Sequence, residues 1–285
     1  MKFLSEVVFQ LFNKKASIDH FKSIGGGCIH QAGVFSFDGG KYFIKWNNYS
    51  SKMFEVEAKG LNLLRKTDSV SIPKVIGSGT VGEVDYLCLE CVESRAQCGT
   101  FWVDFGTSLA QLHRNTAPKF GLDHDNFIGS LPQANELLDN WTDFFIQERL
   151  IPQLKLARDK ALIDASLDQT FERLYPKLPK LIPVESPALL HGDLWSGNFL
   201  VGDEGQAVIF DPAVYYGHRE AELAFTRMFG GFDPLFYQSY HDAFPIDGGF
   251  EERVDIFNLY PLLVHVNLFG PSYLSGINQT LSRFT

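Results

Sequence analysis

The residues best suited to chemistry lie in one stretch, HGDLWSGN, and in the IFDP that follows it. Asp193 precedes Asn198 with four residues between them, and Asp211 ends the second of two short apolar runs after Asn198. This pattern is typical of phosphoryl transfer, in which one carboxylate orients the attacking hydroxyl while an Asn and a second Asp hold a divalent metal. The sequence therefore predicts Asp193 as the catalytic base, and Asn198 and Asp211 as ligands of Mg²⁺ bound with ATP.

A predicted hairpin would bring Asp211 back to Asn198. Gly202 and Gly205 mark a turn between two short apolar runs, so the chain leaves Asn198 on one strand and returns to Asp211 on the next. Asp, Gly and Asn also favour ordinary turns, and Asp193 and Asn198 alone at their spacing would be explained that way. The combination of these two residues with His191, Gly192 and a strand-ending Asp211 favours the catalytic interpretation.

Lys45 is a second candidate, because it ends the apolar run YFIK. It resembles the strand lysine of kinases that contacts the α and β phosphates of ATP. Glu57 lies on the next predicted helix, where it would pair with Lys45. Glu55 is the competitor, but at about 3.6 residues per turn it would lie on the opposite flank of that helix. We therefore expect the pair to be Lys45 with Glu57.

Two further segments are expected to contact the nucleotide. Gly26, Gly27 and Cys28 lie between two predicted strands, where a loop could cover the phosphates, although a glycine run alone is more often a plain turn. Cys28 would be either an exposed thiol near the nucleotide or a small buried residue. In LECVE the chain passes from strands to helices, and there we expect the backbone groups of Glu90 and Val92 to contact the adenine edge.

The elements that must position these residues change character along the chain. Apolar runs punctuated by turn residues predict a short helix over residues 1–13 and then strands of one antiparallel sheet, with one helix at MFEVEAKGLNLLRK. From Gly99 onward, helix-period patterns dominate. We therefore expect an α+β, bilobal protein-kinase-like fold, with a small β-rich N-lobe over 1–92 and a larger, mostly α-helical C-lobe over 93–285.

The bulk composition excludes several classes of protein. The net charge of −9 argues against a nucleic-acid partner, which would require a basic surface. No apolar stretch is long enough to span a membrane, and Glu6 interrupts the N-terminal run that could suggest a signal peptide. Cys88 and Cys91 form a CxxC on a predicted strand, where their side chains would point to opposite faces and bind no metal. We expect a cytoplasmic protein with reduced thiols.

The sequence resembles the fructosamine kinase (ketosamine-3-kinase) family over most of its length. HGD…N is shared with aminoglycoside and choline phosphotransferases, so it indicates only the superfamily. Two other motifs are specific to the fructosamine kinases within this superfamily. They are PQ.N followed by W..FF..RL, and DPA.YYGHRE…FGGF. The matching segments run from about Gly25 to Gly270 and include GGGCI, YFIKWN, MFEVEAKGL, FGTSLAQLHR, FGLDHDNFIGSLPQAN and LLHGDLWSGNF.

The resemblance implies an ATP-dependent kinase that phosphorylates the 3-hydroxyl of ketosamines. Such substrates are fructosamine or ribulosamine adducts of small amines or protein lysines, and the 3-phosphate makes the adduct prone to fall apart. The implied role is therefore deglycation repair. By motif position, Asp193 matches the base, Lys45 the phosphate lysine, and Asn198 and Asp211 the metal ligands. Trp195 would be either a platform for the sugar or a structural residue.

Two positions call for comment against the family pattern. The family usually has Asp in the E-x-D-L stretch after GHRE, where this chain has Glu222. We expect the longer carboxylate to shift at most a hydrogen bond at a helix start, without touching the chemistry. Cys28 matches a cysteine of the glycine loop in many members of the family it resembles, some of them redox-sensitive, so oxidation control is a hypothesis here.

Two alternatives remain. The chain could be another small-molecule phosphotransferase, acting on an aminoglycoside, choline or homoserine, which a substrate panel would distinguish. It could also be a catalytically inactive kinase-like binding module. That interpretation needs a missing functional residue, whereas Lys45, Asp193, Asn198 and Asp211 are all present.

Overall fold

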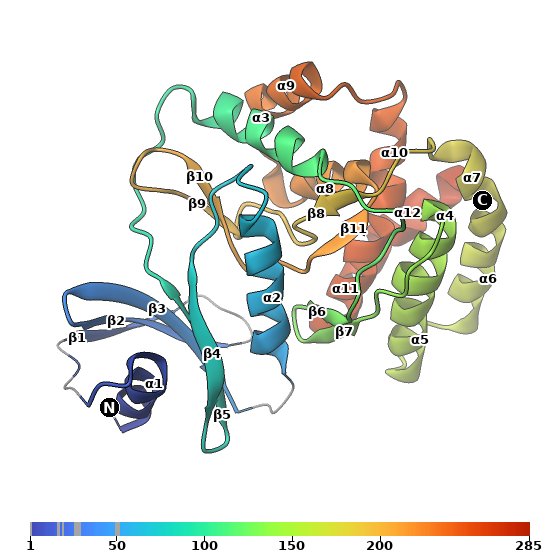
Figure 1. Ribbon diagram of the computed structural model, residues 1–285. Coiled ribbons are helices and arrows are strands. Elements are labelled where there is room, and N and C mark those ends of the chain that lie inside the picture. The colour runs from blue at the N-terminus through green and yellow to red at the C-terminus, as the bar shows by residue number, and fades with distance from the viewer. Residues whose placement is uncertain (1, 16–17, 19, 26–29, 49–51) are drawn as a thin grey trace. The chain divides into compact units, whose positions relative to one another are not determined.

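The computed structural model describes residues 2–15, 18, 20–25, 30–48 and 52–285. Contacts between residues group them into two compact units. The first comprises residues 1–101 together with 199–212, and the second comprises 102–198 together with 213–285. Figure 1 shows the elements of each unit in the colours of the chain.

An antiparallel sheet organises the first unit. Its strands run in the order β1-β2-β3-β5-β4 and are antiparallel to their neighbours. Lys45 pairs with Leu87 in register on the adjacent strand. The strands are β1 His20–Ile24, β2 Gln31–Phe37, β3 Gly40–Asn47, β4 Val75–Val81 and β5 Val84–Glu90.

Helices cover the two faces of this sheet. Alternation along β3 sends Ile44 to the face that α1, Lys2–Phe12, covers with Leu4, Val7 and Val8. Lys45 points to the other face, because its Nζ contacts Glu57 of α2, Met53–Arg65. This helix packs against β4 and β5 (Figure 1). The apolar stripe of α2 that the sequence predicted is buried, at Phe54, Ala58, Leu61 and Leu64. A polar side chain of α2 that lies beside this apolar stripe, Glu57, can therefore reach Lys45.

The predicted hairpin between Asn198 and Asp211 is confirmed. β9, Phe199–Val201, pairs antiparallel with β10, Ala207–Ile209, and the Gly205 N–H donates to the Gly202 carbonyl in the turn. This hairpin groups with the first unit, since the Ile209 N–H donates to the Ser71 carbonyl.

The second unit is mostly helical, as expected. Its short strands form two pairs, β6 Asn126–Ile128 with β7 Leu131–Gln133, and β8 Ala188–Leu190 with β11 Tyr215–Gly217. The helices before β8 are α3 Phe101–His113, α4 Trp141–Phe144, the π-helix η1 Phe145–Leu150, α5 Ile151–Asp159, α6 Ala165–Leu174, the 3-10 turn η2 Tyr175–Lys177 and α7 Leu178–Leu181. After β11 follow α8 Arg219–Thr226, η3 Met228–Gly230, α9 Pro234–Ala243, α10 Phe250–Phe257, α11 Leu259–Phe269, η4 Pro271–Tyr273 and α12 Leu274–Phe284.

None of the helices in the described part of the chain is long and apolar enough to cross a membrane.

Candidate active site

Lys45 lies between two carboxylates in the first unit. Its side chain is buried, with Nζ 2.6 Å from Glu57 Oε1 and 2.8 Å from Asp211 Oδ1. Strand β3 supplies the lysine, α2 supplies Glu57, and the end of the β9–β10 hairpin supplies Asp211. Three residues that are far apart in sequence thus form one charged group.

The pKa values in this group reflect burial and an excess of negative charge. Burial by itself would lower the pKa of Lys45, but the carboxylates of Asp211 and Glu57 together raise it. Burial raises the pKa of Glu57 to about 7, against the opposing effect of Lys45 and with a further increase from Asp211. One ammonium faces two carboxylates, so a further cation could be bound here without an excess of positive charge.

The geometry of α2 determines which glutamate, Glu55 or Glu57, pairs with Lys45. Glu55 pairs with Lys59 at 3.0 Å on the exposed side of α2, and its side chain is 55% exposed. Glu57 is 11% exposed and contacts Lys45. The predicted pairing of Lys45 with Glu57 therefore exists as a contact.

Asp193 and Asn198 lie together in the loop that follows β8, in the second unit. The Asn198 side-chain amide donates from Nδ2 to the Asp193 backbone carbonyl at 2.8 Å and to Asp193 Oδ2 at 3.0 Å. Both amide hydrogens of Asn198 point toward Asp193, which leaves the Asn198 Oδ1 as the atom that could bind a cation. The asparagine thus also fixes the orientation of the aspartate.

Gly192 has a conformation that this loop requires. Its φ is +84°, and a Cβ at this position would lie 2.0 Å from the Ala213 carbonyl oxygen. The Ala213 N–H donates to the His191 carbonyl at 2.9 Å, which holds the two chain segments together. Only glycine fits here, so the glycine of HGD has a steric reason.

Glu222 holds the same loop from α8, contrary to the expectation that it acts only at a helix start. Its carboxylate accepts from the backbone N–H groups of His191 at 3.1 Å and Gly192 at 2.6 Å. Its Oε2 is also 2.9 Å from His113 Nε2. The start of α8 is capped instead by His218, whose Nδ1 accepts from the Glu220 N–H. No pattern along the chain indicates this role, because three strands and the start of α8 separate Glu222 from the loop.

Asp211 adopts an uncommon backbone conformation for a non-glycine residue, with φ +56°. Such left-handed positions cost roughly 1–2 kcal/mol and cluster at functional sites. The conformation directs its carboxylate at Lys45. Among the described residues, no cluster of three or more His, Cys, Asp or Glu side chains could hold a metal by itself. A metal bound by Asp211 would need further oxygen ligands, such as those of a phosphate group.

Trp195 is partly buried and packs edge to face on Phe229, with ring centroids 5.9 Å apart. Its ring also covers Gly197, where a Cβ would lie 2.4 Å from the indole. Trp195 thus has structural contacts on two sides.

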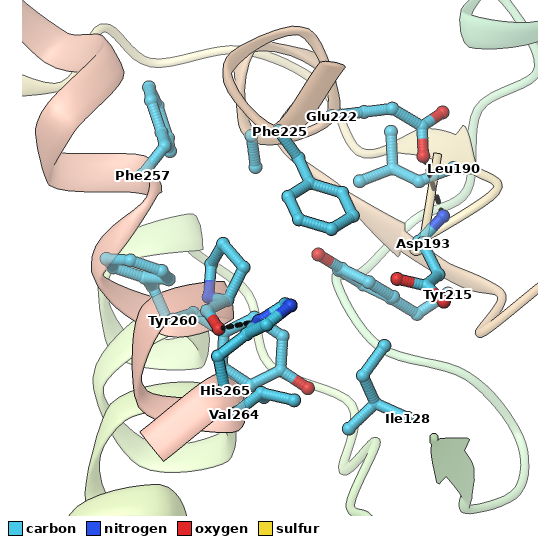
Figure 2. A pocket seen from close by; sticks show the side chains of 14 residues that line it. Ile128, Leu190, Asp193, Tyr215, Glu222, Phe225, Phe257, Tyr260, Val264 and His265 are labelled. Atoms are coloured by element: carbon cyan, nitrogen blue, oxygen red, sulfur yellow. Dashed lines mark hydrogen bonds between the residues drawn. The ribbon is translucent and has the colours of Figure 1, made fainter. Parts of the chain in front are cut away.

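A pocket in the second unit opens beside Asp193. Its lining is mainly apolar, and Figure 2 shows Asp193 and His265 on different sides of it. Tyr260 of α11 donates to Gln133 Oε1 at 2.6 Å, which ties the PQ.N segment to the pocket wall. Residues from widely separated segments of the unit therefore line one cavity beside this carboxylate. They are Ile128, Phe145, Leu190, Gly192, Asp193, Tyr215, Ala221, Glu222, Phe225, Phe257, Tyr260, Pro261, Val264 and His265.

The remaining predicted nucleotide contacts are placed only in part. The Glu90 N–H donates to the Lys74 carbonyl at 2.9 Å, so this amide is already used and any contact to adenine falls to the Glu90 carbonyl. Val92 lies two residues after the end of β5, in the segment that leaves the sheet. Gly26, Gly27 and Cys28 lie outside the described residues.

His30 is a residue of the first unit that the sequence did not single out. Its Nδ1 lies 3.1 Å from Asn47 Nδ2, and its ring packs on Phe54 of α2. Burial, and then the charge of Lys45, lower its pKa to about 4, so the ring is neutral near pH 7. No motif marks a single histidine of this kind in the sequence.

Cys88 of the CxxC is buried within β5 and Cys91 is partly buried just after it, and both are free thiols. Burial raises the pKa of Cys88 to about 12, so its thiol is unreactive.

Comparisons with known proteins agree with this architecture. An aminoglycoside phosphotransferase of known structure superposes with a TM-score of 0.62 at 15% identity, covering 98% of both chains. The fold is therefore protein-kinase-like, with an N-terminal antiparallel sheet and a helical C-terminal part. The chain belongs to the fructosamine kinase family, whose model matches residues 1–285.

Relatives within the family are much more similar. A "Probable ketoamine kinase" of Synechocystis sp. is 39% identical, over 98% of this chain and 95% of the relative. A chloroplastic protein-ribulosamine 3-kinase of Arabidopsis thaliana is 37% identical, over 95% and 84%. The crystal structure of a candidate fructosamine-3-kinase from Haemophilus somnus has a TM-score of 0.90 at 30% identity, covering 99% of this chain and 96% of that one.

Proposed function

We propose that this protein is an ATP-dependent kinase that phosphorylates the 3-hydroxyl of ketosamines, the fructosamine or ribulosamine adducts of amines or protein lysines. Family membership and the names of the ketoamine and ribulosamine kinase relatives support this substrate class. One observation is the main support for the kinase chemistry: buried Lys45 is held between the carboxylates of Glu57 and Asp211. In protein-kinase-like enzymes, a strand lysine paired with a helix glutamate in this way binds the phosphates of ATP. The biological role would be deglycation repair.

In this proposal Asp193 accepts the proton of the substrate's 3-hydroxyl as that oxygen attacks the γ-phosphorus. The bond from this phosphorus to the bridging oxygen breaks, and ADP leaves with the bonding electrons. The hydrogen bond from Asn198 Nδ2 to Asp193 Oδ2 orients the carboxylate before substrate arrives. The Glu222 carboxylate fixes the backbone of the loop one residue earlier. Positioning of this kind is the main contribution that a protein makes to phosphoryl transfer.

The nucleotide would be bound mainly from the first unit. Lys45 would contact the phosphates, with Glu57 holding its ammonium in place. The Glu90 carbonyl and the Val92 N–H would contact the adenine edge, and Gly26, Gly27 and Cys28 would cover the phosphates. In this proposal residues 1–92 bind the nucleotide phosphates, and residues 93–285 contain the catalytic loop and the substrate pocket.

The donor set fits Mg²⁺, a hard cation that prefers oxygen ligands and is usually bound by one or two carboxylates plus substrate phosphates. Asp211 would supply a carboxylate, and Asn198 would supply the amide oxygen that its hydrogen bonds to Asp193 leave available. Bound there with ATP, the ion would neutralise charge on the phosphates.

The test is ATP consumption by the purified protein with Mg²⁺ against fructoselysine, ribuloselysine, choline and kanamycin. We expect turnover with the ketosamines only, and ³¹P and ¹H NMR should place the new phosphate on O3. Turnover with choline or kanamycin alone would overturn the substrate assignment and leave the kinase chemistry in place. An Asp193→Ala control should abolish turnover with every acceptor.

A further inference from the structure

Five aromatic side chains form a continuous surface in the second unit, which we call the aromatic ridge. The ridge begins at Trp195, two residues after Asp193, and passes through Phe229 to His265 with ring centroids 5.9 and 5.0 Å apart. From His265 it continues to Phe269 at 5.5 Å and to Tyr273 at 5.0 Å. Four separate elements of the second unit therefore contribute rings to one surface.

Two of the five rings of the ridge are exposed, although aromatic side chains are more often buried. Phe229 is 46% exposed and Phe269 is 50% exposed. Phe229 is also held at φ +56°, a left-handed conformation that is unfavourable for a bulky residue. An exposed ring kept in a strained backbone indicates a surface that is maintained for contact with something else.

His265 connects the ridge to the pocket that contains Asp193. It lines that pocket, and its Nδ1 donates to the Pro261 carbonyl at 2.7 Å (Figure 2). Burial lowers the pKa of His265, so its ring is neutral near pH 7 and does not repel a cation. The ridge is thus a continuation of the pocket wall, and the ring that joins them is uncharged near pH 7.

We propose that the aromatic ridge binds the carrier arm of the ketosamine, namely its protonated secondary amine and the methylene chain that follows. This inference rests on the proposed function. It adds a binding site for the part of the substrate that the proposed catalytic residues do not contact.

The chemistry of the substrate supports this occupant. In a ketosamine the amine nitrogen is bonded to C1, three bonds from C3, so a 3-hydroxyl at Asp193 places the amine close outside the sugar site. A secondary alkylamine is a cation near pH 7, and cations bind favourably over the faces of aromatic rings. The methylene groups of a lysine arm would cover apolar ring surface as they leave the pocket.

The test compares a ketosamine of lysine within a short peptide with the ketosamine of methylamine. In Phe269→Leu, which keeps an apolar side chain but removes the ring, the ratio of kcat/KM for the lysine substrate to that for the methylamine substrate should fall about 3- to 10-fold. Phe269→Trp should restore the ratio. Phe9→Leu is the matched control, because Phe9 is a similarly exposed ring, 47%, on α1 of the first unit.

The outcomes separate this inference from the proposed function. If wild-type protein turns over both ketosamines and the ratio is unchanged in Phe269→Leu, the ridge does not bind the carrier arm. If Phe269→Leu instead changes only the sedimentation of the protein, the ridge is a self-association surface and the inference is overturned. If wild-type protein turns over neither ketosamine, the proposed function fails and the inference fails with it. Melting temperatures of the variants by circular dichroism identify any loss caused by unfolding.

Discussion

The carboxylate of Glu222 accepts a hydrogen bond from the Gly192 N–H at 2.6 Å, one residue before Asp193. The same carboxylate accepts from the His191 N–H, and it pairs with His113, whose other ring nitrogen lies 2.8 Å from the Tyr240 hydroxyl. Burial raises the pKa of Glu222, but these partners together lower it, so the group is ionised. A buried anion on α8 therefore sets the position of the loop that carries the proposed base.

We expect Glu222→Gln to lower kcat by about 10- to 100-fold, since one backbone N–H would face an amide NH₂ in place of a carboxylate oxygen. The KM for ATP should change little, because the proposed nucleotide contacts lie in the first unit. Steady-state kinetics in both substrates would separate the two effects. Glu252→Gln, an exposed residue on α10, is the control. A lower melting temperature with normal kcat would show that Glu222 is structural only.

Asp193→Asn should reduce turnover by about 100-fold or more, because the amide cannot accept the hydroxyl proton. The side chain keeps its size, so the melting temperature should stay close to that of wild type. Asp242→Asn, at an exposed position of α9, should have no effect on either quantity. Full turnover by Asp193→Asn would rule out its role as the base.

The two glutamates of α2 form a natural pair of variant and control. Glu57→Gln removes one of the two carboxylates that hold the buried ammonium of Lys45, and kcat/KM for ATP should fall about 10- to 100-fold. Glu55→Gln removes only an exposed ion pair with Lys59, of a kind that contributes little, and should leave kcat/KM unchanged. Equal effects of the two substitutions would contradict the assigned role of Glu57.

His30 predicts a dependence of stability on pH. Its pKa is about 4 in the folded protein, against 6.5 for an unperturbed histidine. Below pH 6.5 the unfolded chain binds a proton that the folded chain does not, so stability is lost as pH falls from about 6.5 to 4. In His30→Gln this contribution is absent, while a side chain that can accept from Asn47 remains.

Urea midpoints at pH 7 and pH 5 would measure the effect. We expect the difference between the two midpoints to be smaller in His30→Gln than in wild type. His20→Gln, at an exposed position of β1, should behave as wild type. The same pH difference in wild type and His30→Gln would show that the His30 ring titrates normally.

Much of the candidate site could be predicted because it depends on local periodicity. A strand alternates its side chains, and a helix repeats about every 3.6 residues, so the pairing of Lys45 with Glu57 follows from the sequence pattern. The β9–β10 hairpin was likewise predictable from two apolar runs and two glycines, Gly202 and Gly205. The spacing of Asp193 and Asn198 places both in one loop, where the structure joins them by a hydrogen bond.

The residue pattern along the chain therefore predicts the candidate reactive residues and the elements that carry them. Which distant residues support these candidates depends on the tertiary packing. Glu222 was expected to act at the start of its own helix, and it reaches back to the Gly192 backbone because α8 packs beside β8. The aromatic ridge likewise draws Trp195, Phe229 and Phe269 from separate segments. Contacts of this kind depend on how helices and loops pack in three dimensions, and no period along the chain encodes that packing.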